Sequence, residues 1–157
     1  MMKHRRLVGP LVVAVLTAVL PACGGGGGSS TSPTPTGPTQ AKITVTAGAP
    51  VVTFSPRAGF TFRVTVAVTI TESAGLGANI NFIRLRFIAG GVEIERQEIS
   101  SADIILISGS NRLNASSTRS FNAIFDTNAE AATSGILVFN FTDDRGNNLE
   151  STFTITF

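Results

Sequence analysis

The chain has 157 residues, and its only histidine, His4, and only cysteine, Cys23, both lie near the N-terminus. Three of its 12 basic residues, Lys3, Arg5 and Arg6, precede Cys23, so nine basic and ten acidic residues remain from Cys23 onward. This near-neutral balance disfavours nucleic-acid binding, which needs clustered positive charge. Without other His or Cys, the chain also lacks the residues for His/Cys zinc sites, for an internal disulfide and for Ser–His–Asp or Cys–His catalysis.

Residues 1–22 have the organisation of a secretory signal peptide. A basic start is followed by an apolar run over 7–20, which is shorter than the roughly 20 residues that a membrane-spanning helix needs. The adjacent Arg5 and Arg6 leave twin-arginine export as an alternative route. In either case the sequence predicts that this segment directs export and is then removed.

Cys23 follows directly on Leu20, Pro21 and Ala22. This tetrapeptide resembles the lipobox of bacterial lipoproteins, which implies a diacylglycerol on the Cys23 thiol, cleavage before it and acylation of the new N-terminus. Two or more acyl chains hold a protein stably on a membrane. Gly24, rather than aspartate, follows the cysteine, and the resemblance therefore implies the outer membrane of a bacterial envelope, on its periplasmic or surface face. A reactive thiol or an intermolecular disulfide are the alternatives for a lone cysteine.

Residues 24–40 contain only Gly, Pro, Ser and Thr apart from a single Gln, and they carry no charge. Such a composition cannot bury a core, and we expect a disordered linker. Fully stretched, these residues reach about 55 Å. Together with Cys23 they form a predicted tether, 23–40, between the lipid and a folded domain.

From residue 41 the pattern changes to alternating β-branched and polar residues, which is typical of half-buried strands. In 61–71, every second residue from Phe62 to Ile70 is apolar, and the last segment, 149–157, repeats the pattern. Further strands are expected at 42–47, 50–54, 79–88, 92–99, 103–108, 118–125 and 135–142. No segment shows helical periodicity. Seven to nine short strands predict an all-β fold, a single immunoglobulin-like antiparallel β-sandwich over 41–157.

One hairpin can be given a register from its charges. If Arg86 opposes Glu93 and Arg84 opposes Glu95, then apolar Phe87, Leu85, Val92 and Ile94 share the core face. This register predicts an exposed ladder of charges rather than a binding or catalytic cluster.

The segment 139–157 resembles the final hairpin of bacterial immunoglobulin-like and fibronectin type III-like domains, since Asp144, Gly146 and Asn147 match their D-x-G-N turn. The chain departs from antibody-type domains because it lacks their cysteine pair, core tryptophan and tyrosine corner. The resemblance implies a non-catalytic spacer, adhesion or carbohydrate-binding module.

Two loops hold the candidate binding residues, and we expect both at the end of the sandwich where the tether arrives. They are 72–79, which lacks the Lys-Ser/Thr of a phosphate loop, and 142–148. The candidates are Glu72, Asp143, Asp144, Asn147 and Asn148. Turn chemistry is the favoured role for 142–148, with calcium as the alternative. Adjacent carboxylates at 143 and 144 usually diverge, which disfavours a glycosidase pair; we expect no enzyme and no cofactor.

The sequence thus favours a membrane-anchored lipoprotein that displays a non-catalytic domain for protein binding, adhesion or envelope scaffolding. The alternative is a carbohydrate-binding module of the cell surface, although all 11 aromatic residues are Phe and most fall in the core phase. The partner, a protein or a glycan, is not identified by any motif.

Overall fold

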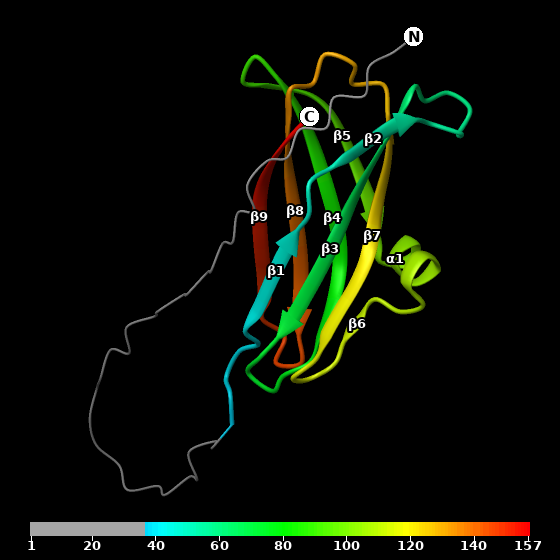
Figure 1. Ribbon diagram of the computed structural model, residues 1–157. Helices are drawn as coiled ribbons and strands as arrows, with labels where there is room; N and C mark the ends of the chain where they lie inside the picture. The colour runs from blue at the N-terminus through cyan, green and yellow to red at the C-terminus, as the bar shows by residue number, and fades with distance from the viewer. Residues whose placement is uncertain (1–36) are drawn as a thin grey trace, which may run out of the picture.

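Residues 37–157 are described by the computed structural model, and they form two antiparallel β-sheets packed face to face (Figure 1). This confirms the predicted immunoglobulin-like sandwich. The first sheet contains β1 (Ile43–Ala47), β2 (Val51–Phe54), β3 (Phe62–Glu72) and β7 (Thr118–Thr127). The second contains β4 (Ala78–Ala89), β5 (Val92–Ser100), β6 (Arg112–Leu113), β8 (Ser134–Asp143) and β9 (Asn148–Thr156).

The strand order leaves two different lateral sides. In the first sheet β3 is central, with β1 and β2 pairing in succession along one edge and β7 along the other. The second sheet runs β5-β4-β8-β9, and the short β6 adds to the start of β4. Across the sandwich β5 contacts β7, while β1 contacts β9. One side is therefore bounded by β5 and β7, and the other by β1 and β9.

The core follows from the alternation in the sequence. Val64, Val66, Val68 and Ile70 of β3 are all buried, as their period-two spacing predicts. They face apolar side chains of the second sheet, among them Phe139, which makes an edge-to-face contact with Phe153 at 6.0 Å between ring centroids.

The prediction of a strand over 103–108 is wrong, because the chain forms helix α1 (Ser101–Ser108) there. The Ser100 side chain accepts a hydrogen bond from the Asp103 N–H, and the Asp103 carboxylate accepts from the Ser100 N–H, which is a capping box. Gly109 ends the helix in the left-handed conformation, with φ of 81°. The periodicity of a short apolar run does not distinguish a strand from a helix. In this segment the capping interactions at both ends determine that a helix forms. Within the described residues, no helix has the length and apolar character needed to cross a bilayer.

The predicted register of the β4–β5 hairpin is also wrong. Arg84 lies opposite Glu98 and Phe87 opposite Glu95, with a β-bulge between Phe87 and Ile88. The turn is the pair Gly90–Gly91, both with positive φ, and Ile88 rather than Arg86 consequently lies opposite Glu93. Val92 and Ile94, which we expected in the core, are exposed.

The charged ladder forms nevertheless, with partly different partners. Arg84 pairs with Glu98 at 2.7 Å, and Arg86 and Arg96 both pair with Glu93. These side chains lie along edge strand β5 and its neighbour, where charges disfavour pairing with another sheet.

Candidate functional site

The loops 72–79 and 142–148 lie together, as the sequence predicted. The Asp144 N–H donates to the Gly77 carbonyl oxygen at 3.0 Å, which joins the β3–β4 loop to the β8–β9 turn. Ala41, just before β1, reaches the same place through its N–H. We call this the N-terminal end of the sandwich, and all five candidate residues are found in it or at its margin.

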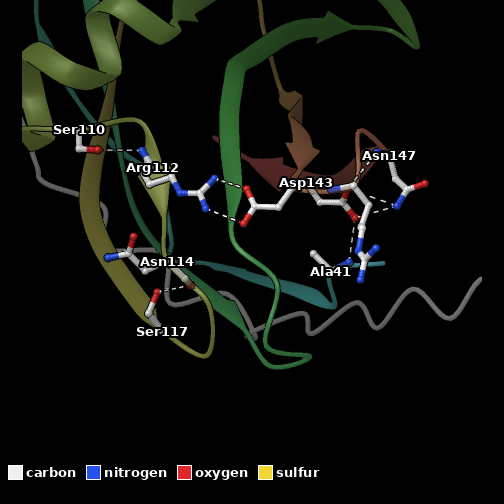
Figure 2. A network of polar contacts seen from close by, with 9 residues as sticks. Ala41, Ser110, Arg112, Asn114, Ser117, Asp143 and Asn147 are labelled. Atoms are coloured by element: carbon white, nitrogen blue, oxygen red, sulfur yellow. Dashed lines mark hydrogen bonds and ion pairs between the residues drawn. The ribbon is translucent and has the colours of Figure 1, made fainter. Parts of the chain in front are cut away.

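Asp143 is a buried acceptor at this end, with only 4% of its surface exposed. Its carboxylate accepts hydrogen bonds from the backbone N–H groups of Ala41, Arg145 and Asn147, each at 2.9 Å, and from the Asn147 side chain (Figure 2). Burial by itself raises the pKa of Asp143, but these donors outweigh it and the pKa lies below its ordinary value. Asp143 therefore holds the turn and the incoming chain as one unit.

Glu72 is the last residue of β3, and only 1% of it is exposed. Like Asp143, it holds separate backbone segments together, in this case three of them. Its carboxylate accepts from the N–H groups of Lys42 at 3.2 Å, Ala74 at 2.7 Å, Gly75 at 2.9 Å and Ser116 at 2.8 Å. Burial raises the pKa of Glu72, and the four N–H donors lower it further than burial raises it. Glu72 lies two residues after Ile70, so the alternation of β3 places its side chain on the inward face. This alternation could have predicted its burial from the sequence.

Asp144, Asn147 and Asn148 are also engaged with protein groups. The Asp144 carboxylate accepts hydrogen bonds from both terminal nitrogens of Arg112, at 2.6 and 2.7 Å. Asn147 donates from its side chain to the Thr39 carbonyl oxygen at 3.0 Å, and Asn148 accepts from the Thr142 hydroxyl at 3.1 Å. Arg112, on β6, is a member of this cluster that no sequence motif indicated.

The exposed pair of Arg112 and Asp144 is expected to contribute little to stability. Because both side chains are partly solvated, we expect Asp144→Asn to lower the free energy of unfolding by less than about 1 kcal/mol, and by less still at high salt. Urea unfolding followed by circular dichroism at two salt concentrations measures this. A larger loss that is unchanged by salt would contradict the assignment.

The geometry favours a structural role for these loops over calcium binding. Calcium takes six to eight oxygen ligands, whereas the carboxylate oxygens of Asp143 and Glu72 already face N–H donors. Within 37–157 no group of three or more His, Cys, Asp or Glu side chains is arranged to hold a metal ion. The turn chemistry favoured from the sequence accounts for the contacts of this end.

The opposite end of the sandwich carries an apolar cleft of about 220 Å³, which we call the distal cleft. Phe87 and Phe157 stack in it with 5.7 Å between ring centroids. Beside it, edge strand β2 exposes its apolar side chains, and 73% of Phe54 is accessible. The cleft is lined by Val52, Phe62, Val64, Phe87, Thr127, Ala129, Glu130, Ala132 and Phe157. Sequence reasoning missed it, because these residues come from five separate segments.

The lipobox residues Leu20, Pro21, Ala22 and Cys23 lie outside the described residues, as do the signal peptide and most of the tether. The expectations about them therefore stay predictions.

No family model matches the chain, and no curated protein matches it. Among solved structures, the chain is similar to one described as ApaA of Bordetella pertussis, with 12% identity and a TM-score of 0.48 over 74% of this chain and 94% of that one. It is also similar to structural genomics target SoR45, with 11% identity and a TM-score of 0.41 over 74% and 86% of the two chains. A β-glucosidase from intestinal bacteria is similar over 73% of this chain and 16% of its own, with 16% identity and a TM-score of 0.26. All three TM-scores are below 0.5, so these likenesses do not bear on function.

Proposed function

We propose that this protein is a lipid-anchored component of a bacterial envelope that displays a non-catalytic immunoglobulin-like domain for binding another protein. The observation that carries the proposal is the separation of the two ends of the sandwich. Hydrogen bonds to Asp143 and Glu72 hold the incoming chain at one end, while the distal cleft and the exposed strand β2 lie at the other. This arrangement suits a domain held at one end and bound at the other.

The polar chemistry of the loops supports a non-catalytic role. An acid or base catalyst must reach its substrate, but Glu72 and Asp143 are buried and saturated by backbone donors. Asp144, the exposed carboxylate of the group, is paired with Arg112. Edge strand β2 instead offers unpaired backbone groups and apolar side chains, which is how strand addition recognises an extended peptide.

Carbohydrate binding is the second candidate, because one aromatic ring is well exposed. Phe54 stacks on Phe62 with 6.0 Å between ring centroids, and its large exposed surface is available to a sugar ring. A pull-down from membranes and a glycan array, both with the same protein, separate the two functions.

Anchoring is tested by Cys23→Ser. We expect this substitution to move the protein from the membrane fraction to the soluble fraction of the envelope, since it removes the thiol that the lipobox resemblance assigns to acylation. Cell fractionation and mass spectrometry of the N-terminal peptide measure the effect. Gly24→Ser keeps the cysteine and serves as the matched control; undiminished membrane association of Cys23→Ser would refute the anchor.

A further inference from the structure

Helix α1 exposes apolar side chains that do not pack into the core of the sandwich. Residues 104–107 read Ile-Ile-Leu-Ile, yet Ile104 alone is fully buried. The next three side chains, Ile105, Leu106 and Ile107, are 45%, 84% and 43% exposed. A run of consecutive exposed apolar residues is unfavourable in water and, on a folded domain, marks an interaction site.

The run is held in a defined position. The capping box of Ser100 and Asp103 fixes the first turn, and Ile104 anchors the helix in the core. The guanidinium of Arg119 donates to the carbonyl oxygens of Ser108 and Arg112, which closes the C-terminal end of the helix onto β7. Leu106 is therefore displayed by a braced helix, on the lateral side formed by β5 and β7 (Figure 1).

The apolar run of the helix ends at a groove on β7 that is lined mostly by polar side chains, among them Ser108, Arg119 and Asn122. This groove separates Ile107 from the outward side chain of Ile124, which is itself exposed. Charge near the run is small and of both signs, with Asp103 on the helix and Arg119 in the groove. A surface of this kind favours an apolar partner without strong net charge.

The tether is long enough for α1 to contact the membrane itself. This inference rests on the proposed lipid anchor. Thr39, whose carbonyl oxygen accepts from Asn147, lies 39 − 23 = 16 positions after Cys23, and a chain of this length reaches up to about 53 Å when extended. The 11 residues of β3 span about 36 Å, and α1 lies part-way along the sandwich from its N-terminal end (Figure 1). The reach therefore exceeds the distance needed for α1 to touch the bilayer that holds Cys23.

We propose that α1 inserts Leu106, together with Ile105 and Ile107, into the surface of this bilayer, so that the sandwich rests on its β5/β7 side. Exposed apolar side chains on a surface helix are stabilised when they are buried at the boundary between headgroups and acyl chains. The opposite side, bounded by β1 and β9, then faces away from the membrane, and with it edge strand β2.

The chain itself provides a clean test, since it contains no tryptophan and one cysteine. The chain from Cys23 onward is coupled through its thiol to a maleimide lipid in phosphatidylcholine vesicles, which replaces biological acylation. Leu106→Trp places a single fluorophore on α1, and Phe54→Trp places one on β2 as the matched control. We expect the emission of Leu106→Trp to shift to the blue and to be quenched by brominated acyl chains, while Phe54→Trp keeps its emission.

Equal quenching of both tryptophans, or of neither, overturns the proposal. A blue shift of Leu106→Trp that depends on protein concentration and not on vesicles also overturns it, because a second copy would then cover the helix. The chemical coupling keeps the two proposals separate: absence of acylation at Cys23 in cells refutes the anchor, whereas the quenching reports on α1 alone.

Discussion

Replacing Glu72 by glutamine is expected to lower the free energy of unfolding by about 2–4 kcal/mol. The carboxylate accepts two N–H groups on each oxygen, from Lys42 and Ala74 on one and from Gly75 and Ser116 on the other. An amide keeps one acceptor oxygen and turns an NH₂ group toward the other two donors. Each lost hydrogen bond to a charged acceptor costs about 1.5–3 kcal/mol, offset in part by water reaching the loops.

Urea unfolding followed by far-ultraviolet circular dichroism measures this loss, because the chain has no tryptophan or tyrosine to report by fluorescence. Glu150→Gln, at an exposed position of β9, is the matched control and should change stability by less than about 0.5 kcal/mol. Equal effects of the two substitutions would show that the contacts of Glu72 do not stabilise the fold.

The same carboxylates make stability depend on acid. The pKa values of Glu72 and Asp143 lie below their ordinary values in the folded protein. Each group therefore stabilises the fold above its unfolded pKa of about 4, and this contribution is lost as the pH falls through the lower, folded pKa. The melting temperature should drop below about pH 4, and it should drop less steeply in Glu72→Gln.

Asp143→Asn is expected to cost about 1–3 kcal/mol and to loosen the chain where it enters β1. The new amide would keep its oxygen toward the N–H groups of Arg145 and Asn147, but its NH₂ group would face the N–H of Ala41. Hydrogen exchange at Ala41 should accelerate more than exchange within β3.

Asp144→Asn, one residue away, is the natural control for this substitution. It changes the same functional group, but at an exposed carboxylate whose partner is Arg112. If both substitutions accelerated exchange at Ala41 equally, the specific role of Asp143 would be refuted.

The sandwich could be predicted from the sequence because apolar residues recur at every second position in its strands, whereas in a helix they recur every three to four positions. The stretch from Phe62 to Ile70 is the clearest case, and from Val64 onward its inward residues are those that the structure buries. The same reasoning failed for 103–108, where a capping box outweighed β-branched composition, and for the β4–β5 hairpin, where a bulge and a Gly-Gly turn moved the register. Helix caps and β-bulges depend on local hydrogen bonds, and the spacing of apolar residues gives no information about those bonds.

The candidate residues were brought together as predicted, but their chemistry could not be read from the sequence. Arg145 and Asn147 are local donors to Asp143, but whether its second oxygen meets solvent or a backbone N–H depends on where Ala41 passes, 102 residues earlier in the chain. Arg112 could not be selected for the same reason, since it meets Asp144 only through the pairing of β6 with β4. The distal cleft could not be predicted either, because its lining residues are brought together only by the strand order.

The direction of β1 has a mechanical consequence. The chain enters the sandwich at Ala41 at one end, and Phe157 lies in the cleft at the other. Tension between the N-terminus and the far end of the domain thus runs along the strands, and the five residue pairs between β1 and β3 resist sliding together rather than opening one after another. The hydrogen bonds of Asn147, Asp143 and Glu72 to Thr39, Ala41 and Lys42 lie at the start of this path. A domain built in this way can transmit a pull from one end to the other while it stays folded.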